Sequence, residues 1–163
     1  MSCIAWRRME AGDAAPLAAL FRAAVTQLAA ADYDAAARAA WASAADDEQA
    51  FAARLARGLT LVAVCEGMPV AFGQLYPADH VEMLYVAPGH ARQGLAAGLL
   101  ARLEAAARLG GATALSAEVS RSARRSFESA GFQKLAEESV CRNGVSLARF
   151  RMRKPLGAAH TQS

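Results

Sequence analysis

Two stretches in the middle of the chain contain groups that could do chemistry. The first is GHARQGLA, residues 89–96, where two glycines surround Arg92 and Gln93 just before an apolar-striped segment. The backbone N–H groups in the first turn of a helix have no intrahelical partner and carry the positive end of the helix dipole. Small residues let a phosphate reach those amides, and Arg92 adds a forked donor. On local features alone, a phosphate site and an ordinary tight turn explain this segment equally well.

The second stretch is HVEMLYV, residues 80–86, which is rich in β-forming residues. Strand alternation predicts one face with His80, Glu82, Leu84 and Val86, opposite Val81, Met83 and Tyr85. His80 or Glu82 could take a proton from an amine, directly or through water, and an unperturbed histidine has the better pKa for a base near neutral pH. The structural alternatives are a charge at a solvent edge for Glu82 and a loop residue for His80.

The elements around these stretches predict a single α/β domain over residues 1–155, with helices on both faces of a mixed sheet. Strands are expected at 2–10, 59–65, 70–76, 80–86 and 113–119, and in a terminal hairpin over 132–154 that turns at Asn143 and Gly144. Helices are expected from an Asp13 N-cap to about Leu28, over two short segments between 31 and 58, and at 95–109 and 120–131. The tail, residues 156–163, is expected to be disordered.

Composition excludes several classes of protein. The 163 residues are 55% hydrophobic and 20% charged, which is typical of a folded globular chain. The net charge of +3 comes from basic residues that are interleaved with acidic ones, which argues against nucleic-acid binding. The three cysteines lack metal-ligand spacing, so no metal is expected. No apolar run is long enough to span a membrane, and we expect a cytoplasmic protein without a membrane partner.

A family resemblance covers nearly the whole chain. The stretch LYVAPGHARQGLAAGLLARLE, followed by LSAEVSRSARRSFESAGF, resembles the core of GNAT-superfamily N-acetyltransferases. The resemblance implies the GNAT acyl-CoA N-acyltransferase fold, with about seven mixed strands and about four helices. It implies acetyl-CoA as co-substrate, direct transfer to a primary amine of a small molecule or peptide, and a homodimer as a further expectation. A non-catalytic acyl-CoA-binding or sensing domain remains the alternative.

The resemblance also assigns coenzyme-binding residues. Gly94 and Ala96 match the glycine-x-glycine/alanine pair of the pyrophosphate loop, and the first position of the motif is Ala91 instead of Gln or Arg. The loop residues expected to hold the pyrophosphate are Arg92, Gln93, Gly94, Leu95, Ala96 and Ala97. The backbone of Leu84, Tyr85 and Val86, at a strand bulge expected there, is implied to hold the pantetheine arm and the acetyl carbonyl. Ser120 is either a pantetheine contact or a helix N-cap.

For catalysis, the family often places a base on the strand before the loop, which here means Glu82 or His80. Many members carry an acidic Tyr in the short helix, where this chain has Phe127. Ser126 beside it could orient or solvate the sulfur, or water could protonate the thiolate. The acceptor pocket is implied to include residues of the early helices, the cleft and the terminal hairpin: Tyr33, Trp41, Glu118, Arg142 and Asn143. The two aromatics fit a core position as well as a pocket.

Overall fold

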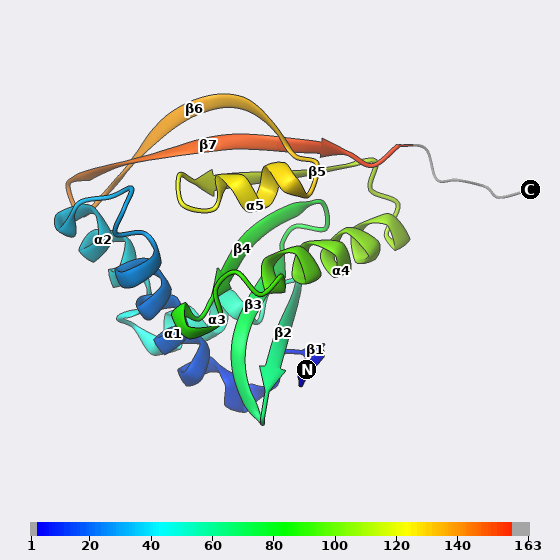
Figure 1. The fold of residues 1–163 in the computed structure, drawn as a ribbon, viewed down its shortest axis with the longest axis horizontal. Coiled ribbons are helices and arrows are strands. Elements are labelled where there is room, and N and C mark those ends of the chain that lie inside the picture. Colours follow the sequence, from blue (N-terminus) through cyan, green and yellow to red (C-terminus); the bar gives the residue numbers. More distant parts are fainter. Residues whose placement is uncertain (1–2, 158–163) are drawn as a thin grey trace, which may run out of the picture.

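The computed structural model describes residues 3–157, and its centre is a seven-stranded mixed sheet (Figure 1). The strand order is β1-β2-β3-β4-β5-β7-β6. Every neighbouring pair is antiparallel except β4 and β5, which are parallel. The strands are β1 (Ile4–Arg8), β2 (Leu59–Cys65), β3 (Met68–Leu75), β4 (His80–Val86), β5 (Ala114–Ser120), β6 (Gln133–Arg142) and β7 (Val145–Pro155).

The helices divide between the two faces of this sheet. Residues 3–157 contain five α-helices, the number that the sequence pattern predicts, where the resemblance implied about four: α1 (Ala14–Ala23), α2 (Ala35–Ala42), α3 (Glu48–Leu55), α4 (Leu95–Leu109) and α5 (Arg124–Ser129). One-turn segments extend them: η1 (Ala11–Asp13), η2 (Ala24–Leu28), η3 (Ser43–Ala45) and η4 (Pro88–His90). Helices α1 and α3 pack on the face that carries Phe72 and Met83. Helices α4 and α5 pack on the opposite face, against Leu115 and Val119.

The parallel pairing of β4 and β5 is very short. It joins His80 to Ser116 and Val81 to Ala117, and no further β4–β5 pair exists among the described residues. Figure 1 shows the two strands running apart beyond this point. The edge of β4 that faces β5 therefore carries backbone N–H and C=O groups without a strand partner from Glu82 to Val86.

A register shift in β4 changes which side chains share a face. Gln74 of β3 pairs with Met83 and Leu75 pairs with Val81, so Glu82 is left without a cross-strand partner. Such a bulge interrupts alternation at the extra residue. Val81 packs in the cluster under α4, yet Met83 and Tyr85 belong to the cluster under α1 and α3.

The prediction that His80, Glu82, Leu84 and Val86 share one face of β4 is therefore wrong in part. His80 and Glu82 lie toward α3, because His80 contacts Ser116 and Glu82 lies near Arg54. Leu84 and Val86 instead pack on the α4 side. The bulge was also expected further along the strand, around Leu84 to Val86, whereas it lies at Glu82.

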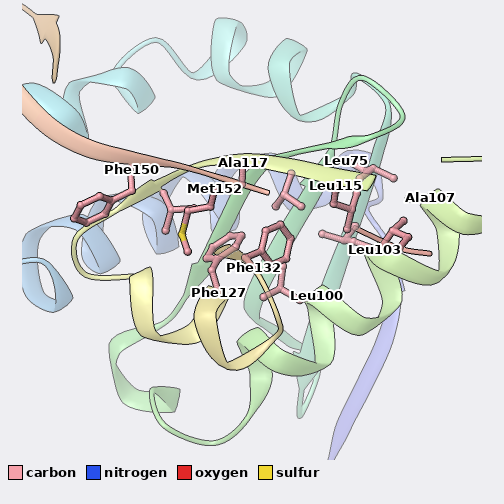
Figure 2. Packing of buried hydrophobic residues seen from close by; sticks show 13 residues of the cluster. Leu75, Leu100, Leu103, Ala107, Leu115, Ala117, Phe127, Phe132, Phe150 and Met152 are labelled. Carbon is pink, nitrogen blue, oxygen red and sulfur yellow. The ribbon is translucent and has the colours of Figure 1, made fainter. Parts of the chain in front are cut away.

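Figure 2 shows the core between α4, α5 and the C-terminal half of the sheet. Leu100, Leu103 and Ala107 of α4 pack toward Leu115 and Ala117 of β5. Phe127 and Phe132 lie edge to face, with ring centroids 5.0 Å apart. Leu156, which was expected to begin a disordered tail, is 3% exposed in this cluster, and its N–H donates to the Thr113 carbonyl. The rest of the predicted tail, 158–163, lies outside the described residues.

An ion pair fixes the edge strand to the start of α1. Asp13 was expected to cap the helix, but its carboxylate accepts hydrogen bonds from Arg7 at 2.6 and 3.0 Å and from the Glu10 N–H at 2.8 Å. Asp13 is 6% exposed. The Arg7 guanidinium holds the pKa of Asp13 below its ordinary value, because its hydrogen bonds favour the ionised carboxylate.

We expect Asp13→Asn to lower the free energy of unfolding at pH 7 by about 2 kcal/mol, less than for fully buried pairs because Arg7 is partly exposed. Because the pKa of Asp13 is lower in the folded protein, ionised Asp13 stabilises the fold at pH values above its unfolded-state pKa of about 3.9. This stabilisation is lost as the pH falls through the folded-state pKa of Asp13. Urea unfolding at several pH values should therefore show the two proteins converging below about pH 4. The exposed Asp46→Asn is the control; an equal loss at all pH values would contradict the ion-pair explanation.

Candidate active site

A cleft opens where β4 and β5 diverge. Its walls come from β4, β5, the early helices and the β6–β7 hairpin, so segments more than 100 residues apart in the chain meet there. The hairpin tip is held against the helices by a hydrogen bond of 2.9 Å from Asn143 Nδ2 to Ser43 Oγ. The residues predicted for catalysis and substrate binding that line this cleft are Tyr33, Trp41, His80, Glu82, Glu118 and Arg142, and Ser120, predicted to contact the coenzyme, lines it as well.

His80 is the centre of a polar cluster at the closed end of the diverging strands. Its Nδ1 lies 2.7 Å from Ser116 Oγ, and its Nε2 lies 3.1 Å from Glu118 Oε2. A carboxylate only accepts hydrogen bonds, so the approach of Glu118 favours the tautomer that carries a hydrogen on Nε2. In the neutral ring, Nδ1 then accepts from the Ser116 hydroxyl. Both ring nitrogens are thus engaged in holding the cluster together.

Glu82 is the less constrained carboxylate of the cluster. Its Oε1 lies 3.7 Å from His80 Nε2, and its Oε2 lies 3.8 Å from Arg54 Nη2. These separations permit electrostatic attraction but exceed hydrogen-bond length. Glu82 therefore has lone pairs free for a ligand, at the bulge where the unpaired edge of β4 begins.

Four aromatic rings form one wall of the cleft. Their centroids are 4.8 Å apart for Phe21 and Tyr85, 6.2 Å for Tyr85 and Trp41, and 5.4 Å for Trp41 and Tyr33. Trp41 Nε1 donates to the Tyr85 hydroxyl at 3.2 Å. Burial raises the pKa of Tyr85 to about 12, because the phenolate would be poorly solvated; the Trp41 bond and the charges of Arg54 and Arg142 oppose this shift. Tyr85 therefore keeps its proton at neutral pH.

Tyr33 has a structural role in addition to its place in the wall. Its hydroxyl donates to the Ala148 carbonyl at 2.6 Å and accepts from the Arg121 N–H at 2.9 Å. These bonds join the segment before α2 to β7 and to the turn after β5. Tyr33 and Trp41 were expected to be either core or pocket residues. Each of them both packs against other aromatic rings and lines the cleft.

The glycine-rich loop leads into α4 on the other side of β4. Gly94 has φ +79° and Arg92 has φ +63°, so the chain turns tightly before the helix begins at Leu95. A Cβ at Gly94 would meet no atom within 4 Å. The positive φ, together with the free space, is what suits this position to glycine.

The first turn of α4 exposes backbone amides to that space. The Gly98 N–H is the first to bond within the helix, to the Gly94 carbonyl at 3.0 Å, which leaves the N–H groups of Leu95, Ala96 and Ala97 without an intrahelical partner. The Leu95 side chain is 4% exposed in the core, so only its amide is available to a ligand. This arrangement is a favourable phosphate cradle, and the missing side chain at Ala91 does not alter it.

Gly98 serves packing instead of anion binding. A Cβ at this position would overlap the ring of Trp6 on β1. The Arg102 guanidinium carbon lies over the same ring, 3.8 Å from the ring centroid. Gly98 thus lets the edge strand approach α4.

Of the two predicted serines, Ser126 lies differently from expectation and Ser120 does not. Ser126 is exposed on α5 and is not among the residues that line the cleft. Ser120 lines the cleft, and its Oγ also accepts a hydrogen bond of 3.1 Å from the Ala123 N–H, so it caps the turn before α5.

Sequence reasoning missed Ser116 and Arg54. Ser116 had a usable signal, since it alternates with buried Leu115 and Ala117 and therefore shares a face with Glu118. Arg54 had none, because it reaches Glu82 only through the packing of α3 across the sheet.

Among residues 3–157, no group of three or more His, Cys, Asp or Glu side chains is placed to hold a metal ion. No helix in the same range is both long and apolar enough to cross a membrane.

Comparison with known proteins identifies the family. The family model described as an acetyltransferase (GNAT) domain matches residues 29–154. The chain is 32% identical over 154 residues to the uncharacterized N-acetyltransferase YafP of Escherichia coli K12, with 94% of this chain and 97% of YafP covered. This chain belongs to the GNAT acetyltransferase family. The predictions of fold class, acyltransferase activity and acetyl-CoA as co-substrate are confirmed at the level of this family.

Solved structures agree with the GNAT assignment. A GCN5-related N-acetyltransferase from Rhodopseudomonas palustris is 42% identical and superposes with a TM-score of 0.93, covering 96% of this chain and 98% of its own. PaiA N-acetyltransferase from Thermoplasma acidophilum, solved with coenzyme A, is 17% identical with a TM-score of 0.78 and coverages of 95% and 99%. At that identity, the similarity of PaiA supports the fold alone.

We expect Gly98→Ala to lower the free energy of unfolding by about 1 kcal/mol, since overlap with Trp6 outweighs the gain in helix propensity. In a Trp6→Leu background the same change should stabilise the GNAT domain by up to about 1 kcal/mol. Urea unfolding of the four proteins measures both values. An equal loss in the two backgrounds would show that Trp6 is not the obstacle.

Proposed function

We propose that this chain is an N-acetyltransferase that transfers the acetyl group of acetyl-CoA directly to a primary amine of a small molecule or peptide. One observation carries the proposal: the unpaired edge of β4 lies between the phosphate cradle and a cleft with an available carboxylate. Direct transfer needs both substrates at one strand edge, and this arrangement provides it.

The coenzyme would be held mainly by backbone. The amides of Leu95, Ala96 and Ala97, with Gly94 and the side chains of Arg92 and Gln93, are suited to the pyrophosphate. The free backbone groups between Leu84 and Val86 are suited to the pantetheine arm, with Ser120 across the divergence. Two fold neighbours support this assignment: PaiA was solved with coenzyme A, and YncA from Salmonella typhimurium, 23% identical over 99% of both chains with a TM-score of 0.68, with acetyl-CoA.

Glu82 is the proposed base, and His80 is a positioning residue. Bound acetyl-CoA supplies a thioester carbonyl that an amine can attack. Glu82 accepts a proton from the acceptor ammonium, directly or through water, which gives the neutral amine. The amine nitrogen then forms the N–C bond to the thioester carbon, the C–S bond breaks, and the second proton lost by nitrogen passes through water to the leaving thiolate. His80 holds Glu118 through Nε2 and is itself fixed by Ser116, which keeps the acidic end of the cleft in one geometry.

Protonation of the leaving thiolate falls to water in this proposal. Phe127 has no proton to give, and Ser126 lies outside the cleft lining. The Tyr33 hydroxyl is engaged with Ala148 and Arg121. A thiolate is a good leaving group with a solution pKa near 8.5, so water suffices near neutral pH.

We expect Gly94→Glu to abolish binding of coenzyme A, measured by isothermal titration calorimetry, with an increase in Kd of at least about 100-fold, because a carboxylate would occupy the anion cradle. Gly12→Glu adds the same charge at a position with equal free space and no positive φ, so it should bind normally. If the wild type binds coenzyme A and Gly94→Glu binds it equally well, the coenzyme binds elsewhere.

We expect Glu82→Gln to lower kcat by about 100-fold without changing the KM for acetyl-CoA, because the amide cannot accept the proton of the acceptor. Release of free thiol across a panel of amines measures this. The exposed Glu137→Gln is the matched control. If His80→Gln lowers kcat by this factor while Glu82→Gln does not, the base is His80. Coenzyme binding without transfer to any amine would support a binding or sensing domain instead.

A further inference from the structure

The cleft contains one arginine whose charge is not matched by a protein carboxylate. Three arginines line it. Arg54 faces Glu82 at 3.8 Å, and Arg149 Nε lies 2.6 Å from Glu138 Oε2. Arg142, at the end of β6, has no carboxylate partner within residues 3–157. Its backbone is held in place because Asn143, the next residue, bonds to Ser43.

The Tyr85 hydroxyl offers a second donor in the same part of the cleft. It accepts from Trp41 Nε1, and none of the described residues accepts its proton. Arg142 lies near enough for its charge to lower the pKa of Tyr85 against the larger effect of burial. The neutral Tyr85 phenol and the Arg142 guanidinium both donate hydrogen bonds, and neither is an anion. Together they suit a carboxylate ligand.

The opposite end of the cleft has the opposite charge. Glu82, Glu118 and His80 lie together there, with Glu82 free to accept from an ammonium group. Glu82 and Tyr85 are three residues apart on β4, which corresponds to about 10 Å along the strand. The rings of Trp41 and Phe21 form an apolar surface beside Tyr85.

We propose that the acceptor is a primary amine that carries a carboxylate at the far end of an apolar or aromatic body. The amine lies at Glu82, and the carboxylate lies at Arg142 and Tyr85. This inference rests on the proposed acetyl transfer and adds the class of acceptor to it. A diamine would place its second cation against Arg142, and a neutral amine would leave that guanidinium unpaired, so both should be poorer substrates.

The test compares 4-(aminomethyl)benzoate with its neutral amide, 4-(aminomethyl)benzamide, which has the same ring and the same reacting amine. We expect kcat/KM for the carboxylate to exceed that for the amide by at least about 10-fold, since a bidentate guanidinium–carboxylate pair would be lost. Arg142→Ala should remove most of this preference, because it should raise the KM of the carboxylate more than that of the amide. Arg142→Lys should restore part of the preference.

Arg151→Ala is the matched control, because Arg151 is an exposed arginine on β7 that does not line the cleft. Calorimetric titration of 4-(aminomethyl)benzoate into wild type and Arg142→Ala gives a second readout that needs no turnover. Equal use of the two compounds, a preference for the amide, or no weakening of binding by Arg142→Ala would overturn the inference. Arginine-dependent binding without thiol release would support the carboxylate site while contradicting the proposed transfer.

Discussion

The site depends on one constraint, which is that β4 and β5 pair for only two residues before they separate. Parallel strands normally continue their ladder, and an unpaired backbone edge inside a protein is costly unless water or a ligand satisfies it. Here His80–Ser116 and Val81–Ala117 close the sheet, and the next five residues of β4 keep one edge free. The antiparallel ladders on the two outer sides, β3 with β4 and β5 with β7, hold the diverging strands in place.

The bulge at Glu82 decides which side chains lie on each side of the free edge. Because alternation is interrupted there, Glu82 points toward α3 together with Tyr85, and Leu84 and Val86 point toward α4. The acidic and aromatic side chains are thus gathered on the face opposite the glycine-rich loop. A regular strand would have placed Glu82 on the same side as Leu84, away from the aromatic wall.

Local pattern predicted most of the fold. The Asn143-Gly144 hairpin, the apolar stripe of α4 and the order of strands and helices each follow from short-range chemistry that the sequence contains. The face of Glu82, the Arg54 contact and the exposed position of Ser126 could not be predicted, because each depends on register or on packing between distant segments. Asp13 is the same case, since its carboxylate could cap a helix or pair with Arg7, and only the tertiary structure decides between them.

Phe127 illustrates how packing limits the chemistry of the site. Its side chain is 4% exposed and lies against Phe132 in an apolar cluster. A hydroxyl on that ring would need a partner, and burial of an unpaired hydroxyl costs about 1–3 kcal/mol. The aromatic wall on the other face is different, since Trp41 bonds to the hydroxyl of Tyr85, and backbone groups of Ala148 and Arg121 bond to that of Tyr33. Tyr33 and Tyr85 therefore bring hydroxyls to the cleft that neighbouring groups bond, whereas Phe127, which lines the same cleft, brings none.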